Sequence, residues 1–228
     1  VATHHSGDPP RGVVGAVADR RVRWVNVDNQ GVIAASRNKG VRLAQGEWIA
    51  FLDSDDLWMP TKLAECLDGI DQETNLICHQ AERFRGGKTL GLTRPVHPKQ
   101  MHYRVMLFEG NCLTPTTTLV KREALEAVGG FSEEKEWITV EDYDLWLRLA
   151  QEGIKARILN KPLARYRLHH ANSSSNVLLH FEAARKLLEH HYDGLELKGK
   201  EEARALTRAV ARQTYGAARQ FQDQGHIK

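Results

Sequence analysis

Three carboxylates directly after an apolar run are the side chains of this chain best suited to chemistry. The run covers residues 48–52, and Asp53, Asp55 and Asp56 follow it around Ser54. An apolar strand of an α/β sheet that ends in such a loop presents its carboxylates where ligands bind, at the carboxyl end of the strand. Their oxygens suit Mg²⁺ or Mn²⁺, which usually bind through one or two protein carboxylates and phosphate oxygens of a ligand. The loop therefore favours a nucleotide-dependent transferase, with Asp55 as the direct metal ligand.

A solvated acidic turn is the alternative interpretation of this loop. Neighbouring carboxylates repel one another, so three of them behind a buried strand are costly unless a cation or hydrogen-bond donors compensate. This cost favours the metal site over the solvated turn.

The elements that must hold the loop alternate between strands and helices. The patterns predict strands at residues 23–27, 47–52, 75–80, 116–120, 156–159 and 163–168, and helices at 29–44, 60–70, 103–109, 123–128 and 140–151. Residues 85–88 are expected to form a hairpin turn, and residues 90–102 an irregular surface loop. From residue 176 onward two charged helices are expected, divided at residues 198–200.

Composition is that of an ordinary globular protein. The chain has 228 residues, 32 basic and 29 acidic, for a formal net charge of +3, which is too small to indicate nucleic acid as a partner. Cys66, Cys78 and Cys112 lie far apart and are expected to be buried free thiols. No apolar run approaches the ~20 residues of a membrane-spanning helix. We therefore expect a cytoplasmic protein, with peripheral contact at the inner face of the membrane left open.

Four blocks of sequence resemble family 2 glycosyltransferases of the GT-A fold. They occur in the family's order, at residues 29–40, 46–56, 128–148 and 166–169, and together span roughly residues 20–175. The resemblance implies an α/β, Rossmann-like GT-A fold: a mixed, mostly parallel sheet flanked by helices. It also implies a glycosyltransferase domain over residues 1–175, and a C-terminal helical extension over residues 176–228.

The resemblance further implies inverting transfer of a sugar from a nucleotide donor to a hydroxyl acceptor, a hexosyltransferase type of reaction. The acceptor needs a general base, and the Glu-Asp motif at a helix start matches Glu141 and Asp142. Asp142 is the first choice for this base, with Glu141 and Asp144 as alternatives. Acidic residues in a first turn also occur simply because they offset the helix dipole.

The donor-side residues follow from the same resemblance. Asp53 is expected to hydrogen-bond the ribose, Arg37 and Asn38 to face the nucleotide, and Asp56 to orient the loop. His169 is expected to reach the metal, Mn²⁺ or Mg²⁺, or the diphosphate. UDP-sugars are the favoured donors, and a sugar or a lipid-linked sugar of surface polysaccharide or glycolipid synthesis is the expected acceptor.

The chain departs from the family at its beginning. Judged against the family, about 40 residues of its opening are expected to be missing, which would leave neighbouring strands with unpaired edges. A fragment or partial chain is favoured over a degenerate copy, because the acidic loops are intact.

Two other functions stay open. One is a non-catalytic relative in carbohydrate assembly, which would bind metal and nucleotide but not need Asp142. The other is a haloacid-dehalogenase-type phosphatase, whose nucleophile loop is also Asp-x-Asp, although Leu57 stands where that motif has Thr or Val. The C-terminal helices carry both charge signs, which favours solvation or a protein partner such as a second copy over a lipid surface.

Overall fold

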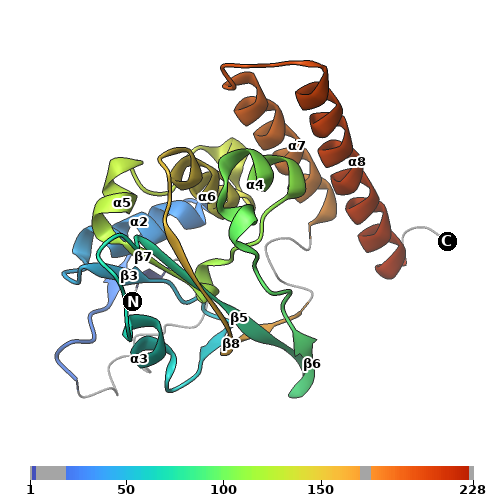
Figure 1. Cartoon of the computed structure of the whole chain (residues 1–228). Coiled ribbons are helices and arrows are strands. Elements are labelled where there is room, and N and C mark those ends of the chain that lie inside the picture. Colours follow the sequence, from blue (N-terminus) through green and yellow to red (C-terminus); the bar gives the residue numbers. More distant parts are fainter. Residues whose placement is uncertain (1, 4–18, 170–175, 226–228) are drawn as a thin grey trace.

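A mixed sheet crosses the centre of the computed structural model, which describes residues 2–3, 19–169 and 176–225 (Figure 1). The strand order is β3 (Trp48–Ala50), β7 (Thr118–Lys121), β5 (Leu76–Arg85), β8 (Ala156–Arg167) and β4 (Leu57–Trp58), with β6 (Lys88–Leu92) paired to β5. A separate parallel pair joins β1 (Ala2–Thr3) to β2 (Val25–Asn26).

The mixed α/β architecture is confirmed, but within the described strands the main sheet is less parallel than expected. Only β5 and β8 run parallel there, whereas the four other pairings are antiparallel. Two features explain the difference. Strand β7 runs opposite to both of its neighbours, and a two-residue turn at Gly86–Gly87 joins β5 to β6, which only antiparallel strands allow.

Helices cover both faces of the sheet (Figure 1). α3 (Lys62–Leu67) lies below it, and the other helices lie above: α2 (Ile33–Leu43), α4 (Tyr103–Glu109), α5 (Arg122–Ala127) and α6 (Glu141–Gln151). Short 3-10 turns occur at Pro98–Met101, Pro115–Thr117 and Lys135–Trp137.

The alternation of side chains along the strands divides the core in two. Cys78 and Val120 face the larger core above the sheet, whereas Ile77 and Leu119 face the smaller core beside Cys66 of α3. Successive strand residues point to opposite faces, so each strand supplies both cores.

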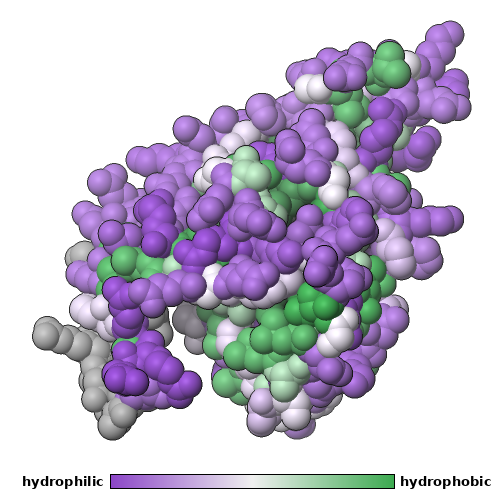
Figure 2. All heavy atoms as spheres, turned by 60° about the vertical axis from the view of Figure 1, so that its left-hand side comes forward, coloured by the Kyte–Doolittle hydropathy of each residue, from purple (hydrophilic) through white to green (hydrophobic). Residues whose placement is uncertain are grey.

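The two C-terminal helices form a hairpin, α7 (Val177–Asp193) and α8 (Lys200–Asp223), that projects beyond the sheet (Figure 1). α7 buries Ala183, Leu187 and Leu188 in the larger core, and α8 adds Ala209. Hence the hairpin packs against the sheet and the helices above it through a shared apolar core. Figure 2 shows the hairpin, at the upper right, as largely hydrophilic with a hydrophobic group at its tip.

Most of the predicted elements are present, with three differences. The two strands expected at 156–168 are one strand, since Pro162 is accommodated at a register shift between β5 and β8. β6 occupies the start of the expected loop at 90–102, and the short strand β4 was not predicted. None of the helices described is both long and apolar enough to cross a membrane.

Candidate active site

Arg37 of α2 joins the two acidic groups that lie far apart in the sequence. Its Nη2 donates to Asp53 Oδ1 at 2.8 Å and its Nη1 to Glu141 Oε1 at 2.6 Å. The guanidinium also lies 5.3 Å from the centre of the Phe131 ring. Burial opposes its charge, but the two carboxylates outweigh that effect and raise the pKa of Arg37. The acidic loop after β3 and the start of α6 are therefore held as one site.

Asn38, the next residue of α2, fixes the loop on which α2 rests. Its amide donates to Phe131 O and Glu133 Oε1, both at 2.8 Å, and its Oδ1 accepts from Phe131 N at 2.9 Å. A Cβ at Gly130 would lie 2.7 Å from that Oδ1, so only glycine fits there. The amide of Asn38 contacts the loop at residues 130–133 and not the acidic cluster. A contact between Asn38 and the nucleotide therefore stays a prediction.

The acidic loop is held from below by β8 and by Thr116. The Asp53 amide donates to Thr116 Oγ1 at 3.1 Å, and Asp56 Oδ1 accepts from the Arg167 amide at 2.8 Å. Asp56 is buried, and this burial, together with the charges of Asp55 and Asp53, raises its pKa to about 6. Asp56 thus orients the loop from within and does not point to solvent.

Asp55 and His169 form a pair at the open side of the loop. Asp55 Oδ2 lies 2.8 Å from His169 Nε2, and about one third of each side chain is exposed. Within the described residues, no group of three or more His, Cys, Asp or Glu side chains could hold a metal by itself. An oxygen and a nitrogen ligand fit Mn²⁺, and one carboxylate fits Mg²⁺, if a ligand's phosphates complete the site.

Asp142 follows Glu141 in the first turn of α6 and lies close enough to Arg37 for their charges to interact. Its Oδ1 accepts from the Tyr143 amide at 2.7 Å, and its Oδ2 is 3.5 Å from Asn111 Nδ2. Burial and then the charge of Glu141 raise the pKa of Asp142 well above the usual carboxylate range, although Arg37 acts in the opposite direction. A carboxylate with a raised pKa is a stronger base, which suits proton removal from a hydroxyl group.

Asp144 is not brought together with this cluster. Its Oδ2 accepts from Arg148 Nη2 at 2.7 Å, and its Oδ1 is 3.2 Å from His191 Nε2 of α7. Burial disfavours the charged form, but these partners outweigh it and lower the pKa of Asp144. Asp144 therefore ties α6 to α7 and, through Arg148, to the carbonyl of Gly130.

Lys62 and Thr116 are buried residues of this region that the sequence analysis did not single out as site residues. Lys62 of α3 is fully buried, and its Nζ donates to Thr116 O at 2.6 Å and lies 4.3 Å from the centre of the Trp58 ring. Burial lowers its pKa to about 7. Thr116 therefore links Lys62 below to Asp53 above. The sequence had indicated only that residues 116–120 form a strand.

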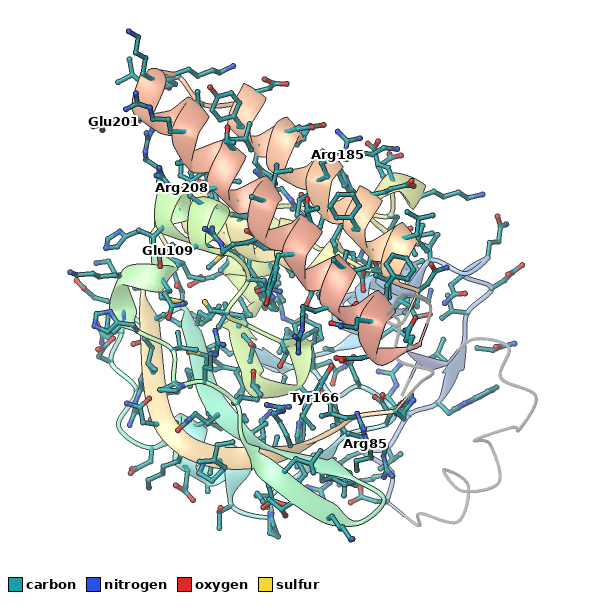
Figure 3. All side chains as sticks on the ribbon, turned by 90° about the vertical axis from the view of Figure 1, so that its right-hand side faces the viewer. Arg85, Glu109, Tyr166, Arg185, Glu201 and Arg208 are labelled. Atoms are coloured by element: carbon teal, nitrogen blue, oxygen red, sulfur yellow. The ribbon has the colours of Figure 1, made fainter. Side chains whose placement is uncertain are left out.

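Tyr166 of β8, labelled in Figure 3, was also missed as a site residue. Burial, followed by the charges of Asp56, Asp55, Asp53 and Asp142, raises its pKa to about 12. The charges of both acidic groups therefore act on this phenol. Its only signal in the sequence was its place three residues before His169.

A cavity of about 220 Å³ opens beside Glu141. It lies between the start of α2, the loop at residues 132–139 and Leu179 of α7. Thr139 lines it with a φ of 79°, a strained conformation for a β-branched residue, two residues before the helix that carries the acidic pair.

Comparison with curated proteins finds glycosyltransferases. An uncharacterized glycosyltransferase from Haemophilus influenzae is 33% identical over 173 residues, covering 73% of this chain and 58% of the relative. The Escherichia coli UDP-Glc:alpha-D-GlcNAc-diphosphoundecaprenol beta-1,3-glucosyltransferase WfaP is 28% identical over 172 residues, covering 75% and 65%. The chain thus spans about 60% of the length of these two relatives.

Solved structures share the fold. Residues 1-349 of S. aureus TarS, in complex with UDP-GlcNAc, align with a TM-score of 0.69 at 16% identity, over 95% of this chain and 63% of that TarS chain. The mannosyltransferase PcManGT from Pyrobaculum calidifontis, in complex with GDP-Man and Mn2+, aligns with a TM-score of 0.60 at 16% identity, over 100% and 66%. The family model described as Glycosyl transferase family 2 matches residues 6–129, more than half of the chain. The chain belongs to glycosyl transferase family 2.

Proposed function

We propose that this protein transfers a sugar from a nucleoside-diphosphate donor to a hydroxyl acceptor with inversion at the anomeric carbon. The observation that carries the proposal is the shared arginine: Arg37 binds Asp53 and Glu141 and so holds the two acidic motifs in one site. Family membership supports the reaction class. It also sets aside the phosphatase alternative, because the acidic loop has a different role in this family.

The donor binds on the side of Asp53 and Asp55. Asp53, which the Thr116 hydroxyl and Arg37 orient, hydrogen-bonds the ribose. A UDP-sugar is the favoured donor, since WfaP is named for UDP-Glc and TarS was solved with UDP-GlcNAc. GDP donors stay possible, because PcManGT was solved with GDP-Man.

Asp55 and His169 would hold the divalent cation together with the donor's diphosphate. When bound, such a cation stabilises the negative charge that the leaving nucleoside diphosphate gains. The protein residues do the remaining work: Asp56 and Arg167 keep the loop in place so that Asp55 faces the ligand side.

Asp142 removes the proton from the acceptor hydroxyl. Direct displacement needs a base near the acceptor hydroxyl, and Asp142, in the first turn of α6 beside the Arg37 partner Glu141, has a raised pKa. The cavity beside Glu141 is the proposed place for the acceptor sugar. By analogy with WfaP, a lipid-linked sugar of surface polysaccharide synthesis is the proposed acceptor.

Thermal unfolding with nucleotides tests the donor side. UDP, dTDP and GDP are each added with and without Mn²⁺ to the wild-type chain, to Asp55→Ala and to a control, Asp68→Ala, whose side chain is exposed and outside the site. A ligand at 100 times its Kd stabilises the folded state by about 2.7 kcal/mol, a rise in Tm of about 5–10 °C.

We expect a Mn²⁺-dependent rise with UDP in the wild type and Asp68→Ala but not in Asp55→Ala. A rise with UDP that does not depend on Mn²⁺ would contradict the metal role of Asp55. No rise with any nucleotide would contradict the donor site in this chain.

A further inference from the structure

Helix α8 carries its arginines in one stripe. Arg204, Arg208, Arg212 and Arg219 are spaced by four, four and seven residues, which places them on the same side of a helix. At 1.5 Å per residue the stripe is ~22 Å long. The sequence has no Asp or Glu between Ala203 and Gln222, so the charge of the stripe is uniformly positive.

The stripe lies opposite the core-facing side of α8. One edge of it borders α4, where Arg212 donates to Phe108 O and Arg208 lines the groove between the two helices. The opposite side of α8 packs inward through Ala209, Leu206 and Val210. Arg204, Arg208 and Arg219 are exposed, and none of them takes part in an ion pair with a described residue. Tyr215 lies within the stripe and is 68% exposed. This side of the helix thus combines free positive charge with an exposed aromatic ring.

The acidic residues of α8 lie at its two ends. Glu202 is occupied by Arg104 of α4 and by the amide of Gly199, so its charge is already neutralised. Glu201 lines a groove of about 450 Å³ between α4 and α8, together with Arg104 of α4 and with Arg204 and Arg208 of the stripe. Asp223 is the last residue of the helix. The middle of the stripe is therefore basic. The sequence analysis noted charges of both signs on the C-terminal helices, and on α8 the acidic residues lie at the ends and the basic residues between them.

We propose that the arginine stripe of α8 is a contact surface for an anionic phospholipid bilayer. Arginines on one face of a helix are attracted to anionic lipid headgroups, and aromatic side chains favour the interface between water and lipid. Leu197, at the turn before α8, is 79% exposed and offers an apolar group at the tip of the hairpin. The hairpin projects from the molecule, so a flat surface can approach it (Figure 1).

Charge also distinguishes the bilayer from a second copy of this chain. Two copies packed through the stripe would bring four arginines of each helix against one another, and like charges at short range repel. An anionic lipid surface instead attracts the exposed arginines of the stripe. The proposal does not depend on the transfer reaction and is tested without it.

Sedimentation with vesicles tests the proposal on the full chain. The vesicles contain either phosphatidylcholine alone or phosphatidylcholine with phosphatidylglycerol. The test variant carries Arg204→Glu, Arg208→Glu and Arg219→Glu. A control carries the same charge change on the β5–β6 hairpin, as Arg83→Glu, Arg85→Glu and Lys88→Glu, all exposed positions. Figure 3 shows Arg208 and Arg85 at opposite ends of the molecule.

We expect binding to the anionic vesicles only, and its loss at 1 M salt, where charges are screened beyond about 3 Å. A basic side chain near an anionic surface strengthens binding roughly fivefold. The α8 variant should therefore bind at least ten times more weakly than the wild type, whereas the control should stay within about twofold. Circular dichroism melting verifies that each variant is folded, and the corresponding triple Gln variant replaces the Glu variant if it is not.

Three results would overturn the proposal. They are no binding of the wild type to anionic vesicles, equal binding to uncharged vesicles, and equal weakening in the α8 variant and the control. Light scattering on the same samples shows whether the stripe instead holds two copies together, in which case the α8 variant would become monomeric without any effect of lipid.

Discussion

A single guanidinium determines how the acidic residues of this site relate to each other. Arg37 is buried between Asp53 and Glu141, and its ring contact with Phe131 limits its movement. Glu141 is thereby committed to Arg37, which leaves Asp142 as the carboxylate with a raised pKa. In the Glu-Asp motif, Glu141 is thus the partner of Arg37, and Asp142 is the candidate base.

Asp142→Asn should lower kcat by about 10²–10⁴ and leave nucleotide binding unchanged, because the amide cannot accept the proton. In the wild type, activity should fall as the pH drops through a pKa above the ordinary carboxylate range, since the base must be deprotonated. Release of nucleoside diphosphate from the donor measures both effects.

Asp144→Asn is the matched control for Asp142→Asn. It should lower the free energy of unfolding by roughly 3 kcal/mol, since it breaks a buried pair, while kcat of the folded fraction persists. If nucleotide binds but Asp142→Asn keeps full activity, Asp142 is not the base. If the wild type binds nucleotide and transfers no sugar, the non-catalytic alternative holds.

At the scale of elements, β4 and α3 form the support beneath the acidic loop. They bring Trp58 and Lys62 below Thr116, and Thr116 holds the amide of Asp53. A buried lysine costs free energy unless it has partners, and here a carbonyl and an indole ring supply them. The support and the loop are therefore one hydrogen-bonded unit.

Lys62→Met should destabilise the protein more at pH 9 than at pH 6. Burial lowers the pKa of Lys62 from 10.5 to about 7, so between these values the unfolded state binds more protons than the folded state. Stability from this residue is then present at high pH and lost as the pH falls through about 7. The cost of the substitution should grow by on the order of 2 kcal/mol between pH 7 and 9.

Urea unfolding across this pH range measures the effect. Lys155→Met, which removes an exposed lysine paired with Glu73, is the control and should show a small cost at every pH. A cost of Lys62→Met that does not change with pH would show that Lys62 is charged in the folded protein throughout.

The helices, strands and loops that carry the site could be predicted from the sequence, whereas the contacts between them could not. The apolar run before Asp53 and the acidic start of α6 were visible as local patterns, and both helix and loop are where they were expected. The hydrogen bonds Arg37–Glu141 and Lys62–Thr116 join residues 104 and 54 positions apart, and no local pattern encodes such pairs. Pro162 lies between the two strands expected at residues 156–159 and 163–168, yet it is accommodated within β8 at a register shift against β5.

At the scale of the whole molecule, the C-terminal hairpin and the sheet share one apolar core. Leu187 and Leu188 of α7 belong to the same buried cluster as Val120 of β7 and Trp146 of α6. Asp144 and His191 add a polar contact between α6 and α7. Residues after 176 are therefore expected to unfold together with the sheet, although the sequence alone suggested an extension.

Leu187→Ala tests this shared core. Leu187 is fully buried, so its truncation should lower the free energy of unfolding by about 2–5 kcal/mol, and the lower Tm should appear in one transition for the whole chain. Leu178→Ala, on the same helix but 55% exposed, should change the free energy by no more than about 0.5 kcal/mol. Calorimetry, together with far-ultraviolet circular dichroism and tryptophan fluorescence, measures the transitions. An early separate transition in Leu187→Ala, in which helix is lost while the tryptophan signal stays native, would show that the hairpin unfolds on its own.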